Sequence, residues 1–317
     1  MVHNKMQLTP LICLSFSITA LLSSSCAKAQ VLGGFRLDNA LIPTNEIHRG
    51  GPPKDGIPSI NQPQFISAEN TDYLKPSDSV IGITINGQSR AYPLRILVWH
   101  EIVNDTIDDQ HIAITYCPLC GTAMVFSRQY RERTLSFGVS GLLYNSDVLM
   151  YDRATESLWS QLGMQAVSGE YKGQPLDWLP STQTSWEDWQ QKHPQTLVLS
   201  TDTGFPRDYA RSPYASYEST ERTHFPVPKN RQEFSNKTWI AGIRINEEAK
   251  AYPLDQLAEA SFEDLVGGSQ IRITWDANNR HFSATHADGT DIPVVHAYWF
   301  AWQAFYPDTT ILQSTDD

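Results

Sequence analysis

The chain has 317 residues, of which 40% are hydrophobic and 11% aromatic, a composition typical of a packed globular protein rather than a disordered one. The formal net charge is -11 and Lys and Arg do not cluster, which argues against a nucleic-acid partner and against adsorption to anionic lipid.

The first 29 residues are typical of a signal peptide. A weakly basic start is followed by an apolar run over residues 8–22, which is short for a transmembrane helix. An A-x-A cleavage site at residues 27–29 predicts a mature chain that begins at Gln30. The alternative is a lipid anchor at Cys26. Either alternative predicts an extracytoplasmic protein, periplasmic or secreted, with no transmembrane segment.

A loop-rich extension over residues 30–78, dense in Gly and Pro, precedes a repeat. Residues 80–94 (VIGITINGQSRAYPL) and 240–254 (IAGIRINEEAKAYPL) agree at eight of fifteen positions, and each predicts a β-hairpin. Three pairs of segments match in the same order: 80–94 with 240–254, 111–117 with 270–276, and 186–196 with 299–309. The offset falls from 160 to 113 by the third pair, so the second copy is shorter by about 47 residues after its central strand.

We therefore predict a β-rich α+β fold built from two related strand-rich units, an internal duplication whose second unit is shorter and degenerate. The expected organisation is a signal peptide (1–29), the extension (30–78), unit one (79–200), a connector (201–236) and unit two (237–312).

Helices are expected to be few. One is predicted to begin near Pro93, and a second lies between the cap residue Ser185 and the stop residue Pro194. The segment 253–265 (PLDQLAEASFEDL) predicts a third.

The motif Cys117-Pro-Leu-Cys120-Gly121 lies between two predicted strands and allows three interpretations. The two thiolates of a tight turn are typical of a metal knuckle, in which glycine permits a positive φ. A thiol–disulfide couple is the second, although such pairs usually begin a helix, which lowers the thiol pKa. The third is a structural cysteine pair, which as a disulfide would close only a small loop and stabilise little.

Two thiolates do not complete a metal site, so other ligands are needed. His100 and Glu101 lie one strand upstream, and an antiparallel return brings them toward the motif. Sulfur and imidazole ligands favour copper or zinc over hard cations.

The segment after the motif is rich in polar side chains, which predict either a ligand-binding cleft beside the knuckle or ordinary turn chemistry. An exposed ion pair between Arg153 and Glu156 belongs to the second alternative. The cleft would be lined by Tyr144, Asn145 and Asp147.

The motifs HEIVND, TYCPLCGTAMVF, FGVSGLLYNSDVLMYDRATESLWSQ and SWEDW together resemble DUF3179, a bacterial and archaeal family of exported proteins defined as a domain of unknown function. The resemblance implies a shared site but names no reaction. Residues that it singles out are His100, Glu101, Cys117, Cys120, Ser140, Asn145, Asp147, Asp152, Arg153, Glu156 and Trp159.

The leading prediction is an exported protein that binds copper or zinc through Cys117, Cys120, His100 and Glu101, with a small-molecule or metal ligand as its partner. The alternatives are a thiol–disulfide oxidoreductase and a non-enzymatic ligand-binding or scaffold protein. The sequence predicts a site without deciding whether the protein is an enzyme.

Overall fold

The computed structural model describes residues 1–3, 30–228, 231–257 and 260–312. Strands account for 43% of the chain and helices for 12%, which confirms the predicted β-rich class. Within the described ranges, no helix combines the length and the hydropathy needed to cross a bilayer. The predicted apolar run and Cys26 fall on residues 4–29, outside the described residues.

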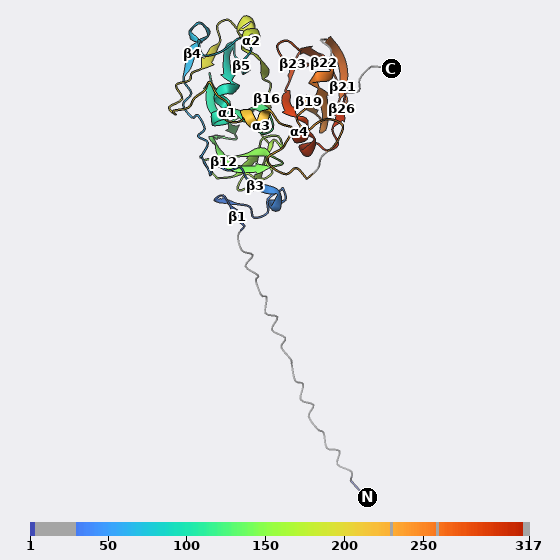
Figure 1. Cartoon of the computed structure of the whole chain (residues 1–317). Coiled ribbons are helices and arrows are strands. Elements are labelled where there is room, and N and C mark those ends of the chain that lie inside the picture. The colour runs from blue at the N-terminus through green and yellow to red at the C-terminus, as the bar shows by residue number, and fades with distance from the viewer. Residues whose placement is uncertain (4–29, 229–230, 258–259, 313–317) are drawn as a thin grey trace.

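The described residues form five sheets of four or five strands, which make up the body of the protein (Figure 1). In hydrogen-bonding order, the first is β17 (Thr182–Ser185), β5 (Ser79–Ile85), β6 (Gln88–Pro93), β18 (Leu197–Leu199) and β4 (Phe65–Ser67). The second is β16 (Trp178–Leu179), β9 (Thr122–Ser127), β8 (Gln110–Cys117) and β7 (Ile102–Ile107). The third is β15 (Gln165–Ser168), β14 (Leu158–Ser160), β13 (Asp147–Asp152), β12 (Phe137–Tyr144) and β3 (Ile47–Arg49).

The last two sheets belong to the C-terminal part of the chain. The fourth is β25 (Val295–Tyr298), β19 (Trp239–Ile245), β20 (Glu248–Pro253) and β26 (Thr310–Ile311). The fifth is β21 (Ala260–Val266), β22 (Ser269–Asp276), β23 (His281–His286) and β24 (Asp291–Ile292). Two small ribbons pair β1 (Val31–Leu32) with β2 (Phe35–Arg36) and β10 (Gln129–Tyr130) with β11 (Arg133–Thr134).

Helices are short and lie between the strands. The α-helices are α1 (Leu94–His100), α2 (Trp186–Lys192), α3 (Ala215–Glu218) and α4 (Trp299–Phe305). Single 3₁₀ turns are η1 (Thr44–Glu46), η2 (Ala68–Asn70) and η3 (Leu254–Gln256).

The sheets follow one another in a propeller-like arrangement. Helix α1 joins the first sheet to the second, β7 contacts β12 of the third, and β20 contacts β21 between the fourth and fifth. Strand β23 of the fifth sheet contacts β17 of the first, and β9 contacts β25. The residues coloured orange to red in Figure 1 therefore lie side by side with the first and second sheets.

The two matched regions of the sequence have the same strand connectivity. In the first sheet β5 pairs with β6 and β17, and β18 joins β6 in parallel, just as β19, β20, β25 and β26 are arranged in the fourth. The second and fifth sheets also agree, with β16-β9-β8-β7 corresponding to β24-β23-β22-β21. The third sheet has no counterpart, because most of it comes from residues 128–177 between β9 and β16, whereas only residues 287–290 join β23 to β24.

A glycine and a tryptophan occupy equivalent places in both regions. The indole N–H of Trp189 donates to Thr196 Oγ1 at 3.0 Å, and that of Trp302 donates to Thr309 Oγ1 at 2.9 Å. A Cβ atom on Gly82 would lie 2.2 Å from the Trp189 ring, and one on Gly242 would lie 2.5 Å from the Trp302 ring.

Gly82→Ala and Gly242→Ala are each expected to lower the free energy of unfolding by about 2 kcal/mol, because a buried indole must move to admit the methyl group. Chemical denaturation measures this, with the exposed Thr84→Ala on the same strand as the control, expected to change it by less than about 0.5 kcal/mol. Wild-type stability in both glycine variants would contradict the packing described.

Two of the three predicted helices form. Helix α1 follows Pro93, and the Ser185 side chain caps α2 by accepting from Asp188 N–H at 3.2 Å. The predicted helix over 253–265 is wrong: its N-terminal part is η3, and residues 260–266 form β21. Seven-residue pairing with β22 overrides the helical propensity of this segment.

Candidate metal centre

The two cysteines lie where β8 turns into β9. Cys117 pairs with Thr122 in the last register position of the hairpin, and Cys120 N–H donates to the Cys117 carbonyl at 3.2 Å. Gly121 has φ 67, the positive value that the motif predicted, and a Cβ atom there would lie 2.5 Å from the Trp239 ring. The motif is therefore a tight strand-to-strand turn and does not begin a helix.

A second hairpin tip faces this turn from the third sheet. Tyr144 and Asp147 pair across a two-residue turn in which Asn145 and Ser146 have φ of 50 and 65, as type I′ turns require. The Ser146 carbonyl accepts from both thiols, with distances of 3.7 Å to Cys117 Sγ and 3.3 Å to Cys120 Sγ.

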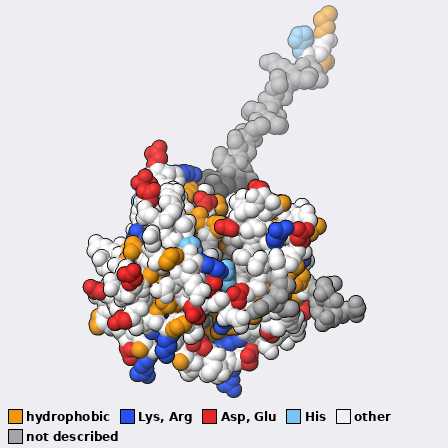
Figure 2. Space-filling view, turned by 90° about the horizontal axis from the view of Figure 1, so that it is seen from above, with side chains coloured by type: hydrophobic (Ala, Val, Ile, Leu, Met, Phe, Trp, Pro, Cys, Tyr) orange, Lys and Arg blue, Asp and Glu red, His pale blue; other side chains and the backbone are white. Residues whose placement is uncertain are grey.

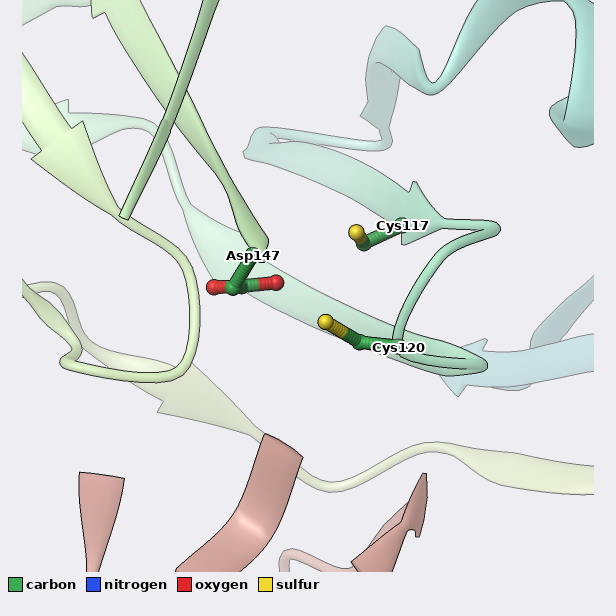
Figure 3. A group of neighbouring side chains, drawn as sticks. All are labelled: Cys117, Cys120 and Asp147. Carbon is green, nitrogen blue, oxygen red and sulfur yellow. The ribbon is translucent and has the colours of Figure 1, made fainter. Parts of the chain in front are cut away.

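The turn directs the Asp147 carboxylate at the two sulfurs (Figure 3). One potential ligand atom from each of Cys117, Cys120 and Asp147 lies within 4.8 Å of the others, and no second group of three such residues occurs among the described residues. The exposed fractions are 2%, 0% and 1%. Asp147 Oδ2 accepts from Leu162 N–H at 2.9 Å, whereas Oδ1 is buried without a hydrogen-bond partner.

The electrostatics of this group are those of buried acids without a compensating cation. Burial raises the pKa of Asp147 to about 7 and raises the pKa of both thiols. The ion pairs among the described residues leave Asp147 out. A bound cation would stabilise the ionised forms of all three groups.

Glu101 is a further buried carboxyl group, and it interacts electrostatically with this site. It ends α1 with φ 57, and its carbonyl accepts from the N–H of Tyr116 at 2.7 Å. Its pKa is raised to about 8, first by burial and then by the negative charge of Asp147. The charge of Glu101 therefore couples to that of Asp147, but Glu101 does not belong to the group of three residues whose ligand atoms lie within 4.8 Å of one another.

His100 lies elsewhere, contrary to the predicted ligand set. Its Nδ1 is 2.8 Å from the Pro58 carbonyl and its Nε2 is 2.7 Å from the Tyr209 hydroxyl, so both ring nitrogens already have partners. The left-handed conformation of Glu101 ends the helix directly after His100. Asp147, which the sequence assigned to ligand binding, has the position expected of the imidazole.

Three residues singled out for ligand binding have structural partners. The Ser140 hydroxyl donates to the Leu149 carbonyl and accepts from the Leu142 N–H, where the register of β12 with β13 shifts. Asp152 accepts from Thr155 N–H at 2.7 Å and from the indole N–H of the fully buried Trp159 at 3.0 Å.

The remaining predicted residues divide between ion pairs and a cavity. The expected pair of Arg153 with Glu156 is wrong, because Arg153 binds Asp55 at 2.7 Å and Glu156 pairs with Lys54. Tyr144 and Asn145 line a cavity of about 590 Å³ between the third and fourth sheets.

The connector covers the cysteine turn. The sequence did not predict this contact. The Tyr217 hydroxyl donates to the Leu119 carbonyl at 2.7 Å, and Ser146 Oγ donates to the Phe225 carbonyl at 3.1 Å. Tyr217 is 2% exposed. The aromatic residues of the connector could have indicated that it packs against the rest of the protein. Their spacing has no period, however, and so does not identify the segment that they contact.

The equivalent turn of the fifth sheet closes without sulfur. Asp276 and Asn279 stand where Cys117 and Cys120 stand in the second sheet, and two hydrogen bonds of 3.2 and 2.8 Å join them. Both turns dock in the same way: the Asn279 carbonyl accepts from Ser185 N–H at 3.1 Å, and the Cys120 carbonyl accepts from Tyr298 N–H at 2.8 Å. This turn does not require thiols for its shape.

The model of a family described as "Protein of unknown function (DUF3179)" matches residues 54–290. No curated protein and no solved structure shows a significant match to the chain. The matched range covers most of the chain, including the cysteine turn, the third-sheet hairpin and the connector, and it confirms the resemblance seen in the motifs. The chain therefore belongs to the DUF3179 family.

Proposed function

We propose that this protein binds a zinc ion through the thiolates of Cys117 and Cys120 and the carboxylate of Asp147. The observation that carries the proposal is the buried group of Cys117, Cys120 and Asp147, whose ligand atoms lie within 4.8 Å of one another and in which Asp147 Oδ1 has no hydrogen-bond partner. An uncompensated buried carboxylate costs free energy, and a divalent cation removes that cost. Glu101, whose charge couples to that of Asp147, is the candidate for the fourth position of a closed tetrahedral site.

Zinc suits this ligand set better than copper. Zinc accepts thiolate sulfur and carboxylate oxygen together, whereas copper(I) selects soft sulfur ligands. Without the imidazole that the sequence predicted, one half of the set is hard oxygen. Copper therefore becomes the competitor to test rather than the expected ion.

Thiol–disulfide exchange is less well supported. A reactive thiol needs a lowered pKa, usually from a helix N-terminus or a neighbouring cation, and here burial raises the pKa of both cysteines. A purely structural pair is also less well supported, because Asp276 and Asn279 close the same turn by hydrogen bonds.

We also propose that units one (79–200) and two (237–312) arose by duplication, that the metal site belongs to unit one alone, and that the mature chain works outside the cytoplasm. The shared connectivity of the sheets supports the first statement, and the N-terminal apolar run supports the last. In an oxidising compartment bound metal would keep neighbouring thiols from oxidising, which fits a closed zinc site.

The proposal predicts about one zinc ion per chain after loading and dialysis of the full-length protein. In the Cys117→Ser/Cys120→Ser variant the zinc content is expected to fall below about a tenth of that. The serine hydroxyls can still donate to the Ser146 carbonyl, so the variant should keep its fold, which circular dichroism checks. Elemental analysis measures the metal, and equal zinc in both proteins would contradict the proposal.

A further inference from the structure

The three proposed ligands are sealed from solvent. Cys117, Cys120 and Asp147 are each no more than 2% exposed, so an ion can reach or leave them only if a covering segment moves. Figure 2, which views the molecule from above, shows acidic side chains spread over that face rather than gathered around one opening. Charge on that face therefore marks no route for a cation, and the route has to be sought among the segments that pack on the cysteine turn.

Most of these segments are strands held in sheets. β9 continues the hairpin of the turn itself, β13 carries Asp147, and β25 begins a hydrogen bond from Tyr298 N–H to the Cys120 carbonyl. Residues 212–228 of the connector, here named the cover, are different. Among the described residues, every backbone-to-backbone hydrogen bond of the cover has its partner inside the cover, whose one helix is the four-residue α3.

One buried side chain anchors the cover over the site. Tyr217, at 2% exposure, is the only buried residue among residues 212–228. Its hydroxyl donates to the carbonyl of Leu119, which lies between the two cysteines in sequence, at 2.7 Å. The Lys237 ammonium donates to the Tyr217 carbonyl and lies 3.2 Å from the centre of its ring. A segment with so few buried contacts opens at a lower free energy than the sheets around it.

The chain just before the cover is fixed to α1. The indole N–H of Trp99 donates to the Arg211 carbonyl at 3.0 Å, and the Tyr209 hydroxyl lies 2.7 Å from His100 Nε2. A movement that begins at residue 212 leaves these contacts intact. Besides the Tyr217 contacts, it breaks the hydrogen bond of 3.1 Å that Ser146 Oγ donates to the carbonyl of Phe225 in the cover.

We propose that the cover opens locally, with Tyr217 as its anchor, and that the metal ion passes to the cysteines through this opening. A long segment without strands that lies over a site is typical of a lid. The inference rests on the proposed function for the identity of the ion. The opening itself exposes the two thiols whether or not an ion binds, and it can therefore be measured without zinc.

Thiol labelling of the zinc-free full-length protein with an aromatic disulfide reagent measures the opening. A Cys13→Ser/Cys26→Ser background confines the signal to Cys117 and Cys120. The labelling rate should depend little on low urea concentrations, because a local opening exposes little surface. Tyr217→Phe, which removes the hydrogen bond and keeps the ring, should raise the rate about five-fold. A rate with the full urea dependence of global unfolding would overturn the proposal.

Tyr306→Phe is the matched control. The Tyr306 hydroxyl donates to the Leu162 carbonyl at 2.5 Å beside the cavity between the third and fourth sheets, and Leu162 N–H donates to Asp147. This change removes the same kind of bond next to the site without touching the cover, so labelling at the wild-type rate is expected. Faster labelling in Tyr306→Phe together with the wild-type rate in Tyr217→Phe would place the opening at that cavity and overturn the assignment.

Zinc release separates this inference from the zinc proposal. Tyr217→Phe should lose bound zinc to a chelator about five-fold faster than the wild type, while its zinc content at saturation stays the same. Faster labelling of Tyr217→Phe in a protein that binds no zinc would support the cover and contradict the zinc proposal alone. Normal zinc content with unchanged labelling and unchanged release in Tyr217→Phe would overturn the cover alone.

Discussion

Replacing Asp147 by asparagine is expected to lower the affinity for zinc by about 100-fold or more while leaving the protein folded. The amide has the size of the carboxylate and keeps an oxygen for the Leu162 N–H, which now lies 2.9 Å from Oδ2. It removes the negative charge that would stabilise the ion next to the thiolates. Competition with a chromophoric zinc chelator measures the affinity.

Asp152→Asn is the matched control for this change. Asp152 lies at the other end of β13, is fully buried, and binds Thr155 and Trp159 rather than the cysteines. The control should lose stability, because the hydrogen bonds from Thr155 and from the Trp159 indole to the Asp152 carboxylate are weakened. It should keep the wild-type zinc affinity. The assignment of Asp147 fails if both variants bind zinc equally well.

The second large effect is a loss of stability of the zinc-free protein as the pH rises. The folded-state pKa values of Asp147 and Glu101, about 7 and about 8, lie above their ordinary values of 3.8 and 4.5. Between these limits the unfolded chain ionises and the folded protein does not, so rising pH favours unfolding. This direction is opposite to that of a carboxylate held in an ion pair.

The expected decrease in the free energy of unfolding between pH 5 and pH 8 is on the order of 6 kcal/mol from the two groups together. Zinc should offset it at pH 8, since the ion replaces the missing protons, and should matter little at pH 5. Urea denaturation at both pH values, with chelator or with zinc, measures the four conditions. A zinc-free protein that gains stability from pH 5 to pH 8 would contradict the uncompensated acid cluster.

The sequence predicted the elements that depend on interactions between neighbouring residues, such as helix caps and hairpin turns. The Ser185 cap and the Pro194 stop predicted α2. The two repeated hairpins form with the same register: Val80 pairs with Pro93 in the first, and Ile240 pairs with Pro253 in the second. Segment 253–265 failed because its strand is stabilised by pairing with β22, an interaction that a helical pattern does not reveal.

The site was predicted in part for the same reason. The cysteine turn depends on neighbouring residues and on Gly121, so its shape was readable in the motif. Which ligand faces it depends on how the third sheet docks, and this sets Asp147 against the sulfurs while His100 turns to Pro58 and Tyr209. Such long-range contacts leave no periodic signal in a single sequence.

X-ray absorption at the zinc edge of the loaded full-length protein identifies the atoms that bind the ion. We expect two sulfur neighbours at about 2.3 Å together with oxygen neighbours at about 2.0–2.2 Å, and loss of the sulfur shell in the Cys117→Ser/Cys120→Ser variant. A first shell of oxygen and nitrogen alone, or one that survives the double serine substitution, would contradict it.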